Sequence, residues 1–215
     1  MTVRLVLATH NAKKVGELRA ILGPVMPDLA PEEVVGAGDI GAPSPVEDGV
    51  TFAENALIKA RALARATGLP AVADDSGLSV DVLGGAPGIF SARWAGSARG
   101  DEANLRLLLE QLADVRPEHR RAHFHCAAAF VTPEGFEHVV EGRLPGLLTD
   151  APRGDGGFGY DPILVPDEQP ARAAGGQPLT SAELTAEEKN AISHRGVAFR
   201  ALAPVVAAHL ASRTP

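Results

Sequence analysis

The strongest candidates for chemistry in this sequence are two adjacent carboxylates, Asp74 and Asp75, at the end of a short apolar run. Neighbouring carboxylates repel each other, so the pair costs stability unless a cation or hydrogen-bond donors offset the charge. Successive side chains of a strand point to opposite faces, so at most one of the two should reach a given site. A hard metal ion with oxygen ligands would suit that carboxylate together with Glu47. An Asx-turn or a helix N-cap is the structural alternative.

Lysine is the rarer basic residue in this chain, and its positions are therefore informative. Of the 20 basic residues, 16 are Arg, and the lysines are Lys13, Lys14, Lys59 and Lys189. A lysine retained among arginines indicates a position that needs a compact ammonium on a flexible side chain rather than a planar guanidinium. Chance is the alternative, and the test is whether these lysines fall inside motifs found independently.

The segment Thr9-His10-Asn11-Ala12-Lys13-Lys14 lies between a predicted strand and a predicted helix. Backbone N–H groups at a helix start favour an anion, and Lys14 adds a positive charge there. The segment contains no glycine and is therefore not a Walker motif. The alternative is an ordinary Thr or Asn cap followed by solvated lysines.

A second polar segment, Glu47-Asp48-Gly49, precedes a predicted helix that begins with the capping-box spacing of Thr51 and Glu54. Asn55 on its first turn and Lys59 about one turn later would lie near the helix start. The alternative is an amphipathic helix with solvated charges.

The glycine-rich segment Gly154–Pro162 holds one Phe and the only Tyr of a chain that is 4% aromatic. Glycines allow close approach of the backbone, and rings beside them suit a nucleobase pocket. A flexible turn is the alternative.

A last polar segment contains His194 and Arg195, which would be favourably placed at a helix C-terminus even without a ligand.

The elements that must position these segments follow from the apolar patterns. These patterns predict strands at Val3–Ala8, around Val34–Val35, at Ala71–Ala73, at Ala122–Val131 and at Phe136–Leu144. They predict helices through Val15–Leu22, from Thr51 to Gly68, over roughly Asp101–Leu112, from Thr185 to Ser193 and after Gly196. Pro204 inside the last helix predicts a kink or a break. The last two strands form an antiparallel hairpin, so we expect an α/β fold with a mixed sheet.

The totals of the chain define its class. A length of 215 residues with 45% hydrophobic and 22% charged residues predicts a globular protein, with residues 1–215 forming a single domain. The net charge of -7 argues against nucleic acid as the main partner. Cys126 is the only cysteine, which excludes an intrachain disulfide. The apolar run Val3–Ala8 is too short for a signal-peptide core or a membrane span, so we expect no membrane association and a cytoplasmic location.

Taken together, six motifs resemble the XTP/dITP diphosphatase family, and the resemblance runs from Val6 to about Phe199. The motifs are Thr9-x-Asn11-x-x-Lys14, Glu47-x-Gly49-x-Thr51-Phe52-x-Glu54-Asn55-Ala56, Ala73-Asp74-Asp75-Ser76-Gly77-Leu78, Leu83-Gly84-Gly85-Ala86-Pro87-Gly88, Gly157-Phe158-Gly159-Tyr160-Asp161-Pro162 and Ser193-His194-Arg195-Gly196. Any one motif would be weak, whereas six in this order are highly specific.

This resemblance implies a Mg²⁺-dependent enzyme of nucleotide metabolism. Such an enzyme cleaves a deaminated purine nucleoside triphosphate (ITP, dITP or XTP) between the α- and β-phosphates, releasing the monophosphate and pyrophosphate. The resemblance also implies an elongated mixed β-sheet flanked by helices, two lobes around a central nucleotide cleft, and a homodimer. Donors aimed at the 6-keto oxygen would disfavour adenine, which carries an amino group there.

The resemblance also assigns roles to residues by their match to the family motifs. Asp75 and Lys59 are implied as catalytic residues, with Asp75 as general base, and Glu47 and Asp75 are implied as metal ligands. The residues implied to bind substrate are Thr9, His10, Asn11, Ala12, Lys13, Lys14, Ser76, Phe158, Gly159, Tyr160, Asp161, Lys189, His194 and Arg195.

Two departures from the family pattern concern one loop. The family often has a lysine where this chain has Leu179, and the preceding loop, Gln169–Gln177, is longer than usual. The resemblance therefore assigns this loop no role in closing over the substrate.

Two other functions remain open at the level of sequence. One is a related triphosphate pyrophosphatase that resembles the Maf-like proteins, which act on pyrimidine or methylated nucleotides. The other is a nucleotide-binding regulator without turnover, against which the intact Asp75 and Lys14 argue.

Overall fold

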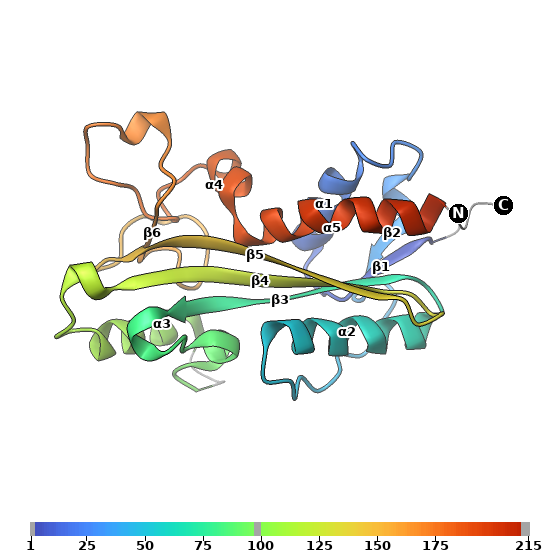
Figure 1. Cartoon of the computed structure of the whole chain (residues 1–215), viewed down its shortest axis with the longest axis horizontal. Helices are drawn as coiled ribbons and strands as arrows, with labels where there is room; N and C mark the ends of the chain where they lie inside the picture. Colours follow the sequence, from blue (N-terminus) through green and yellow to red (C-terminus); the bar gives the residue numbers. More distant parts are fainter. Residues whose placement is uncertain (1–2, 97–99, 212–215) are drawn as a thin grey trace. The chain divides into compact units, whose positions relative to one another are not determined.

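The computed structural model describes residues 3–96 and 100–211 (Figure 1), with the side chain of Lys13 outside that description. Its strands are β1 (Leu5–Leu7), β2 (Val34–Gly36), β3 (Ala71–Val80), β4 (Arg121–Val131), β5 (Glu137–Leu148) and β6 (Leu164–Pro166). Its α-helices are α1 (Ala12–Leu22), α2 (Phe52–Thr67), α3 (Gly100–Gln111), α4 (Ala186–Ile192) and α5 (His194–Ala211). Short 3₁₀ turns connect some of these elements, among them Gly88–Arg93.

The six strands form one sheet in the order β2-β1-β3-β4-β5-β6. Strand β1 is parallel to both β2 and β3, whereas β5 is antiparallel to β6. The N–H of Thr132 donates to the carbonyl of Phe136 at 2.9 Å in the short turn between the neighbouring strands β4 and β5. The predicted mixed sheet and α/β class are therefore confirmed.

The chain divides into two compact units, each built from separate stretches of sequence. The first unit comprises Met1–Asp75, Cys126–Gly142 and Arg195–Pro215, and the second comprises Ser76–His125 and Arg143–His194. The single domain over residues 1–215 stays a prediction.

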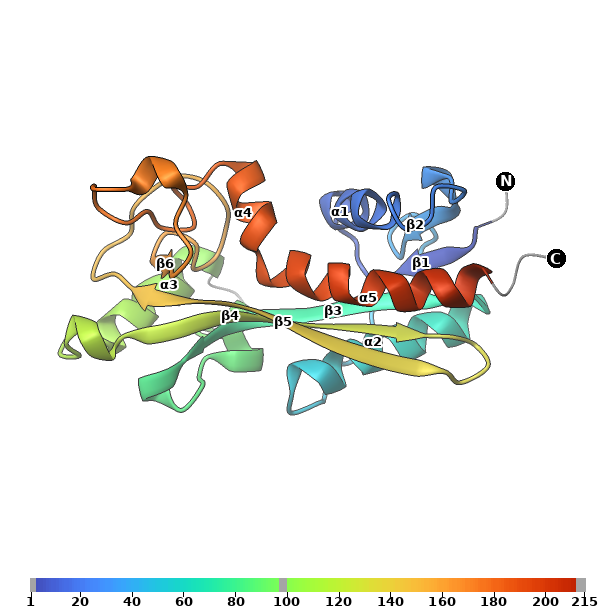
Figure 2. The ribbon, with the colours of Figure 1, turned by 45° about the horizontal axis from the view of Figure 1, so that its top comes forward.

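The core of the first unit is an apolar cluster that includes side chains of β1, α1 and α5. Leu18 of α1, Phe199 of α5 and Leu5 of β1 are almost completely buried in this cluster. Within this unit, α1 and α5 cover one face of the strands and α2 covers the other (Figures 1 and 2). Side chains of β3 that alternate in direction therefore meet different helices.

The core of the second unit is a separate cluster around α3 and the strand ends. Leu108 and Leu112 are fully buried with Leu78 of β3 and with Ile163 and Leu164 near β6. The leucine spacing of α3 thus covers one apolar face, as the sequence pattern predicts.

The predicted capping box at the start of α2 is confirmed. Thr51 Oγ1 accepts a hydrogen bond from the N–H of Glu54, and the Glu54 carboxylate accepts one from the N–H of Thr51, both at 3.1 Å. Gly68 ends the helix in the left-handed conformation, with φ of 66°. Because both ends are defined locally, α2 presents Asn55 and Lys59 in a fixed register.

The predicted boundaries of β3 and α5 are wrong. Strand β3 continues through Asp74 and Asp75 to Val80 instead of ending before them, because both carboxylates find partners on their own sides of the strand. Helix α5 begins at His194 and passes through Pro204 without a break. Burial of Phe199, Val206 and their neighbours offsets the cost of the proline.

Within residues 3–96 and 100–211, no helix is long and apolar enough to cross a membrane.

Candidate active site

The two carboxylates of β3 point to opposite sides of the strand, as their adjacency predicts. Asp74 accepts hydrogen bonds from Lys14 Nζ at 2.9 and 3.0 Å, one to each carboxylate oxygen, and from Arg195 Nε at 3.2 Å. Its side chain is 1% exposed. A Glu17 carboxylate oxygen lies 3.7 Å from Nη1 of the same guanidinium, and Glu17 is more exposed than Asp74. A buried carboxylate therefore lies between two cations that come from α1 and α5.

Asp74 is an anchoring residue that the sequence reasoning did not place in the site. Burial by itself would raise the pKa of Asp74, but Lys14 and Arg195 outweigh burial and hold that pKa far below its usual value. The carboxylate is therefore ionised at neutral pH and fixes both cations. The available signal was the adjacency to Asp75, because the second carboxylate of such a pair must also be neutralised.

On the other side of β3, Asp75 faces α2. Asp75 accepts a hydrogen bond from Lys59 Nζ at 2.9 Å and one from Asn55 Nδ2 at 3.3 Å. The same Lys59 ammonium donates to Glu47 at 3.2 Å. Here one cation lies between two carboxylates, the reverse of the arrangement around Asp74.

The pKa values on this side reflect burial and the second carboxylate. Burial raises the pKa of Asp75 above its usual value, Lys59 opposes that shift, and Glu47 adds to it. Burial lowers the pKa of Lys59, but Asp75 and Glu47 outweigh burial and raise it. Asp75 is therefore a better proton acceptor than a solvated carboxylate would be.

A close backbone contact positions the loop that carries Glu47. The N–H of Gly49 donates to Asn55 Oδ1 at 3.0 Å. A Cβ at position 49 would lie 2.7 Å from that oxygen and 2.7 Å from Cβ of Glu54, which no real side chain tolerates. Glycine is therefore required where the loop meets the start of α2.

Glu47 and Asp75 suit a magnesium ion by their chemistry. Within the described residues, no group of three or more His, Cys, Asp or Glu side chains could hold a metal. Mg²⁺ in nucleotide enzymes is held by one or two carboxylates, with water and substrate phosphates completing its shell. Two carboxylates, with the Asn55 amide beside them, fit that requirement.

The start of α1 presents exposed polar groups, and its predicted role as an anion site stays a prediction. Thr9 Oγ1 accepts a hydrogen bond from the N–H of Asn11 at 3.1 Å, and Asn11 and Ala12 are exposed. His10 is exposed, and its Nε2 lies 3.2 Å from Ser44 Oγ. The Lys13 side chain lies outside the described residues. The backbone at this helix start is thus accessible to an anion, and Lys14 on the same first turn is held by Asp74.

In the second unit, the glycine-rich loop closes around Asp161. This buried carboxylate accepts hydrogen bonds from the N–H of Phe158 at 2.8 Å and from Lys189 Nζ at 2.5 Å. The Lys189 ammonium also lies 5.4 Å from the centre of the Phe158 ring, which is 66% exposed. Gly157 has φ of 75°, and a Cβ there would collide with the Asp161 carboxylate and lie 2.9 Å from Lys189 Nζ. The loop thus presents an aromatic ring with an ammonium beside it.

The ring of Tyr160 does not offer the stacking surface that the sequence suggested. Tyr160 is 5% exposed and belongs to the core of the second unit, and its hydroxyl donates to the carbonyl of Ser91 at 2.9 Å. The N–H of Gly159 donates to Asp101 at 3.1 Å. The sequence of a glycine-rich loop does not show whether its Tyr ring is buried or exposed. Here the ring is buried because it packs into the core of the second unit.

His194 and Arg195 do not lie at a helix C-terminus, so that prediction is wrong. Helix α4 ends at Ile192, and the two residues form the first turn of α5. A cation at a helix start is disfavoured by the dipole, and for Arg195 the contact with Asp74 offsets that cost. The His194 ring stacks on Phe124, with centroids 5.1 Å apart and an interplanar angle of 21°. Ser76 is half-buried in β3.

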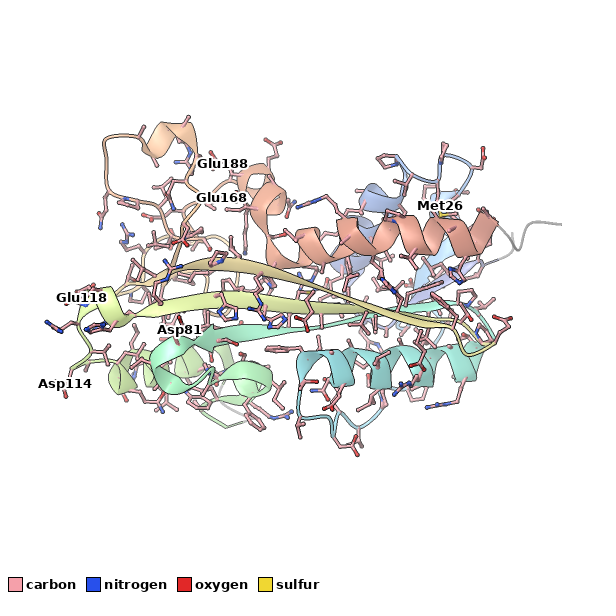
Figure 3. The ribbon with its side chains drawn as sticks, in the orientation of Figure 1. Met26, Asp81, Asp114, Glu118, Glu168 and Glu188 are labelled. Carbon is pink, nitrogen blue, oxygen red and sulfur yellow. The ribbon has the colours of Figure 1, made fainter. Side chains whose placement is uncertain are left out.

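The long loop before Thr180 is attached to α4 by ordered contacts. Arg172 donates two hydrogen bonds of 2.8 Å to Glu188, which is labelled in Figure 3, and one of 2.9 Å to the carbonyl of Glu183. Gln169 exchanges hydrogen bonds with the backbone of Leu179, at 2.8 and 3.1 Å. The loop therefore rests on the helix that carries Lys189, although Leu179 replaces the lysine that the family often has.

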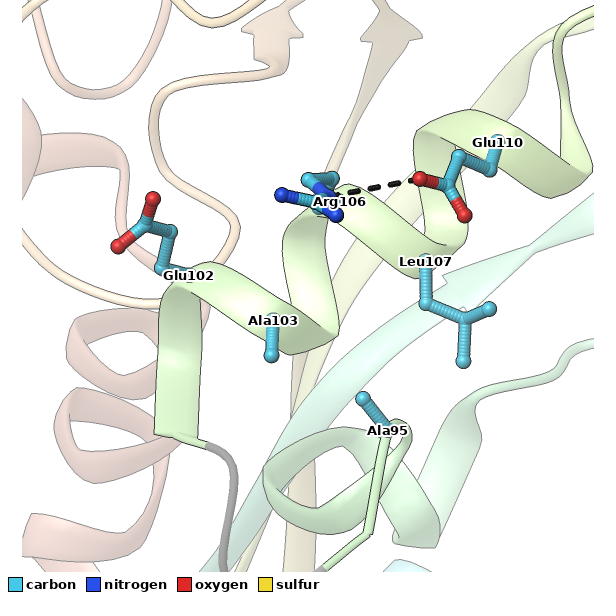
Figure 4. A pocket seen from close by; sticks show the side chains of 6 residues that line it. All are labelled: Ala95, Glu102, Ala103, Arg106, Leu107 and Glu110. Carbon is cyan, nitrogen blue, oxygen red and sulfur yellow. Dashed lines mark ion pairs between the residues drawn. The ribbon is translucent and has the colours of Figure 1, made fainter.

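A pocket of about 330 Å³ lies elsewhere in the second unit, beside α3 (Figure 4). Arg106 and Glu110 form an ion pair of 3.4 Å on its rim. The residues that line it are Ala95, Glu102, Ala103, Arg106, Leu107 and Glu110, none of which belongs to the predicted site. The charged groups on β3 and α2, rather than this pocket, therefore define the candidate site.

The fold and these groups define a class: a mixed-sheet α/β protein with a charged site built on its β3 strand. A family model described as the Ham1 family matches residues 5–205. The chain belongs to this family. It is 64% identical over 204 residues to a dITP/XTP pyrophosphatase of Streptomyces coelicolor, a match that covers 94% of this chain and 96% of the relative.

Solved structures agree with this assignment. The Staphylococcus aureus Ham1 protein is 36% identical with a TM-score of 0.81, and the match covers 96% of this chain and 99% of that one. A structure named nucleoside-triphosphatase / dITP/XTP pyrophosphatase from Mycobacterium abscessus is 48% identical with a TM-score of 0.73, over 94% of this chain and 100% of that one. The family resemblance inferred from the six motifs is confirmed.

Proposed function

We propose that this protein hydrolyses dITP, ITP and XTP to the corresponding monophosphate and pyrophosphate. Its curated relatives at 47 to 64% identity are named dITP/XTP pyrophosphatases. The structural observation that carries the proposal is the pair of opposite charge arrangements on β3. A carboxylate between two cations lies on one side, and a cation between two carboxylates lies on the other.

The first of these arrangements serves the triphosphate. Lys14 is held by Asp74 within one turn of the exposed start of α1, where Thr9 and Asn11 lie. A helix start and a fixed ammonium are together a favourable environment for phosphate oxygens.

The second arrangement serves the metal and the water. Glu47 and Asp75 would hold Mg²⁺, which would supply positive charge to neutralise the phosphate oxygens. Asp75 acts as the general base that orients and deprotonates the attacking water. Lys59, in contact with both carboxylates, acts as a catalytic cation.

The second unit supplies groups suited to a purine. The exposed ring of Phe158 is a stacking surface, and the Lys189 ammonium beside it, which donates to Asp161, has further N–H groups that can only donate. A donor suits the 6-keto oxygen of hypoxanthine or xanthine and is poorly matched to the 6-amino group of adenine. His194 and Arg195 are proposed to bind near the base, as the family motif implies.

We also propose that the protein acts in the cytoplasm as a homodimer, with a nucleotide rather than a nucleic acid or a membrane as its partner. The net charge of -7 supports the absence of a nucleic-acid partner. The homodimer rests on the family resemblance alone.

The deciding experiment is product analysis of the purified protein with dITP, ITP, XTP, dATP, GTP, UTP and TTP in the presence of Mg²⁺. We expect pyrophosphate as the first product and a preference for dITP, ITP and XTP. Asp75→Asn should lower kcat by about 10² to 10⁴ because it removes the proton acceptor. Asp114→Asn, a change of the same kind at an exposed position, should leave kcat unchanged.

Three results would contradict the proposal in different ways. Orthophosphate as the first product would show that the cleavage position is wrong. A strong preference for UTP or TTP would favour the Maf-like activity. Tight binding of ITP without any product would favour a regulator that binds nucleotide without turnover.

A further inference from the structure

The ammonium of Lys59 occupies the position between the two carboxylates that the proposed function assigns to a metal. Its Nζ lies 2.9 Å from an oxygen of Asp75 and 3.2 Å from an oxygen of Glu47. The exposed fraction of the side chain is 13% for Lys59, 15% for Asp75 and 36% for Glu47. The lysine and at least one of its partners are thus largely removed from solvent.

Two carboxylates at this spacing need a positive charge between them. Without one, they repel each other in a partly desolvated environment, which disfavours the ionised form of both. Lys59 supplies that charge from within the chain, because it is fixed on α2 about two turns after the N-cap Thr51. The pair is therefore neutralised in part before any ligand arrives.

We infer that Lys59 is a built-in counter-ion that competes with the divalent metal for Glu47 and Asp75, and that it turns to the substrate phosphates when the metal binds. The inference rests on the proposed function. An ammonium and a divalent cation require the same carboxylate oxygens, so Lys59 must give up at least one of its two ion pairs. The free energy of those ion pairs is then a cost of metal binding.

The neighbouring residues allow this exchange without loss of the site. Asn55 donates to the second oxygen of Asp75, at 3.3 Å, and accepts from Gly49 next to the Glu47 loop. The first bond holds the Asp75 carboxylate, and the second holds the loop that carries Glu47, when the ammonium moves. The flexible four-carbon side chain of lysine allows the ammonium to move away from the carboxylates. The planar guanidinium of an arginine would be less able to do so.

The exchange couples the metal to the nucleotide. An ammonium displaced from the carboxylates is a free cation next to the site, and a triphosphate gives it new partners. The nucleotide should therefore tighten metal binding, and by linkage the metal should tighten nucleotide binding by the same factor. Without Lys59, the part of this coupling that passes through the ammonium disappears.

The test measures Mn²⁺ binding to the metal-stripped full-length protein, by the electron paramagnetic resonance signal of the free ion and without nucleotide. Lys59→Met keeps the length of the side chain and removes its charge. We expect it to bind Mn²⁺ about tenfold more tightly than the unsubstituted protein. Arg61→Met is the matched control, because it removes the same charge from the same helix where Arg61 pairs with the exposed Glu137. Its Mn²⁺ affinity should change by less than about twofold, because salt screens exposed charges.

A second arm repeats the titration with a non-hydrolysable dITP analogue. The analogue should tighten Mn²⁺ binding more in the unsubstituted protein than in Lys59→Met. Lys59→Gln gives a second neutral variant, and thermal unfolding of each variant confirms that it is folded.

The outcomes separate this inference from the proposed function. Equal or weaker Mn²⁺ binding in both neutral Lys59 variants, with binding lost in Glu47→Gln, would overturn the inference and leave the metal site intact. Mn²⁺ binding that does not respond to Glu47→Gln would overturn the metal site itself, and the inference with it. If Arg61→Met tightened Mn²⁺ binding as much as Lys59→Met, the effect would come from the change in net charge. That result would also overturn the inference.

Discussion

At the scale of single residues, the two aspartates of β3 differ in what surrounds them rather than in their chemistry. Asp74 lies between Lys14 and Arg195 and has a strongly lowered pKa, whereas Asp75 shares a single lysine with Glu47 and has a raised pKa. Because successive side chains of a strand point to opposite faces, these adjacent residues lie in different environments. One carboxylate is thus suited to permanent ionisation and the other to accepting a proton.

Asp74→Asn should be strongly destabilising. The substitution keeps the shape of the side chain but leaves Lys14 and Arg195 without their buried counter-charge. We expect the free energy of unfolding to fall by about 3 kcal/mol, as for other broken buried ion pairs. Urea unfolding followed by circular dichroism measures this change. Asp114→Asn is the control, and an equal loss in both variants would contradict a specific role for Asp74.

The same residue makes stability depend on acid pH. The folded pKa of Asp74 is lowered, so the unfolded chain, with a pKa of about 3.9, binds the proton first. Its contribution is therefore complete at neutral pH and is lost as the pH falls below about 4. The difference in free energy of unfolding between the unsubstituted protein and Asp74→Asn should shrink from pH 6 to pH 3. A difference that stays constant over this range would show that the charge of Asp74 is not the cause.

At the scale of elements, the glycine-rich loop of the second unit depends on one glycine more than on its neighbour. Gly157 and Gly159 both have positive φ, but only at position 157 would a Cβ collide with Asp161 and approach Lys189. Substitutions at these two positions can therefore separate the effect of the backbone conformation from the effect of the contact with Asp161 and Lys189.

Gly157→Ala and Gly159→Ala test this difference. Gly159→Ala adds only the strain of an L-residue at positive φ, about 1 kcal/mol. Gly157→Ala adds that strain and also displaces the Lys189 ion pair, so we expect a larger loss of stability and a several-fold higher KM for dITP. Thermal unfolding and steady-state kinetics measure both effects. Equal KM values in the two variants would show that the position of Lys189 does not matter for the substrate.

Helix α4 depends on the loop that precedes it. Arg172 joins that loop to Glu188, which also completes the capping box with Thr185 and has a pKa lowered to about 2 by these contacts. Both partners are at the surface, so Arg172→Ala should change overall stability little.

The expected effect of Arg172→Ala is local. The amides of the loop and of the first turn of α4 should exchange hydrogen several-fold faster, as measured by mass spectrometry. Arg106→Ala, which breaks an exposed ion pair on α3, is the control and should leave this region unchanged. Unaltered exchange in the Arg172 variant would mean that the backbone contacts of Gln169 suffice.

At the scale of the whole molecule, charge and burial decide which partners are compatible. The chain has 27 acidic and 20 basic residues, and several of the basic ones are engaged in ion pairs with acidic side chains. We expect no mobility shift of a duplex DNA of about 20 base pairs at micromolar protein and physiological salt, because phosphate affinity depends on cation number. Retention of DNA that weakens with added salt would contradict this expectation.

The sequence by itself determined most of the elements and the family of this protein. The capping boxes at Thr51 and Thr185, the periodic leucines of α3 and the apolar strands are local signals, and the structure confirms them. The six motifs likewise carry their meaning in residue type and order, and they identified the family without coordinates.

Only the tertiary structure decided which charges meet. Asp74 is separated from Lys14 by 60 residues and from Arg195 by 121, so no local pattern could show that this carboxylate holds both cations. The extension of β3 beyond Asp75 and the burial of the Tyr160 ring were also decided by partners distant in sequence. Local periodicity fixes backbone conformation within a few residues, whereas ion pairing and burial depend on which distant segments the fold brings together.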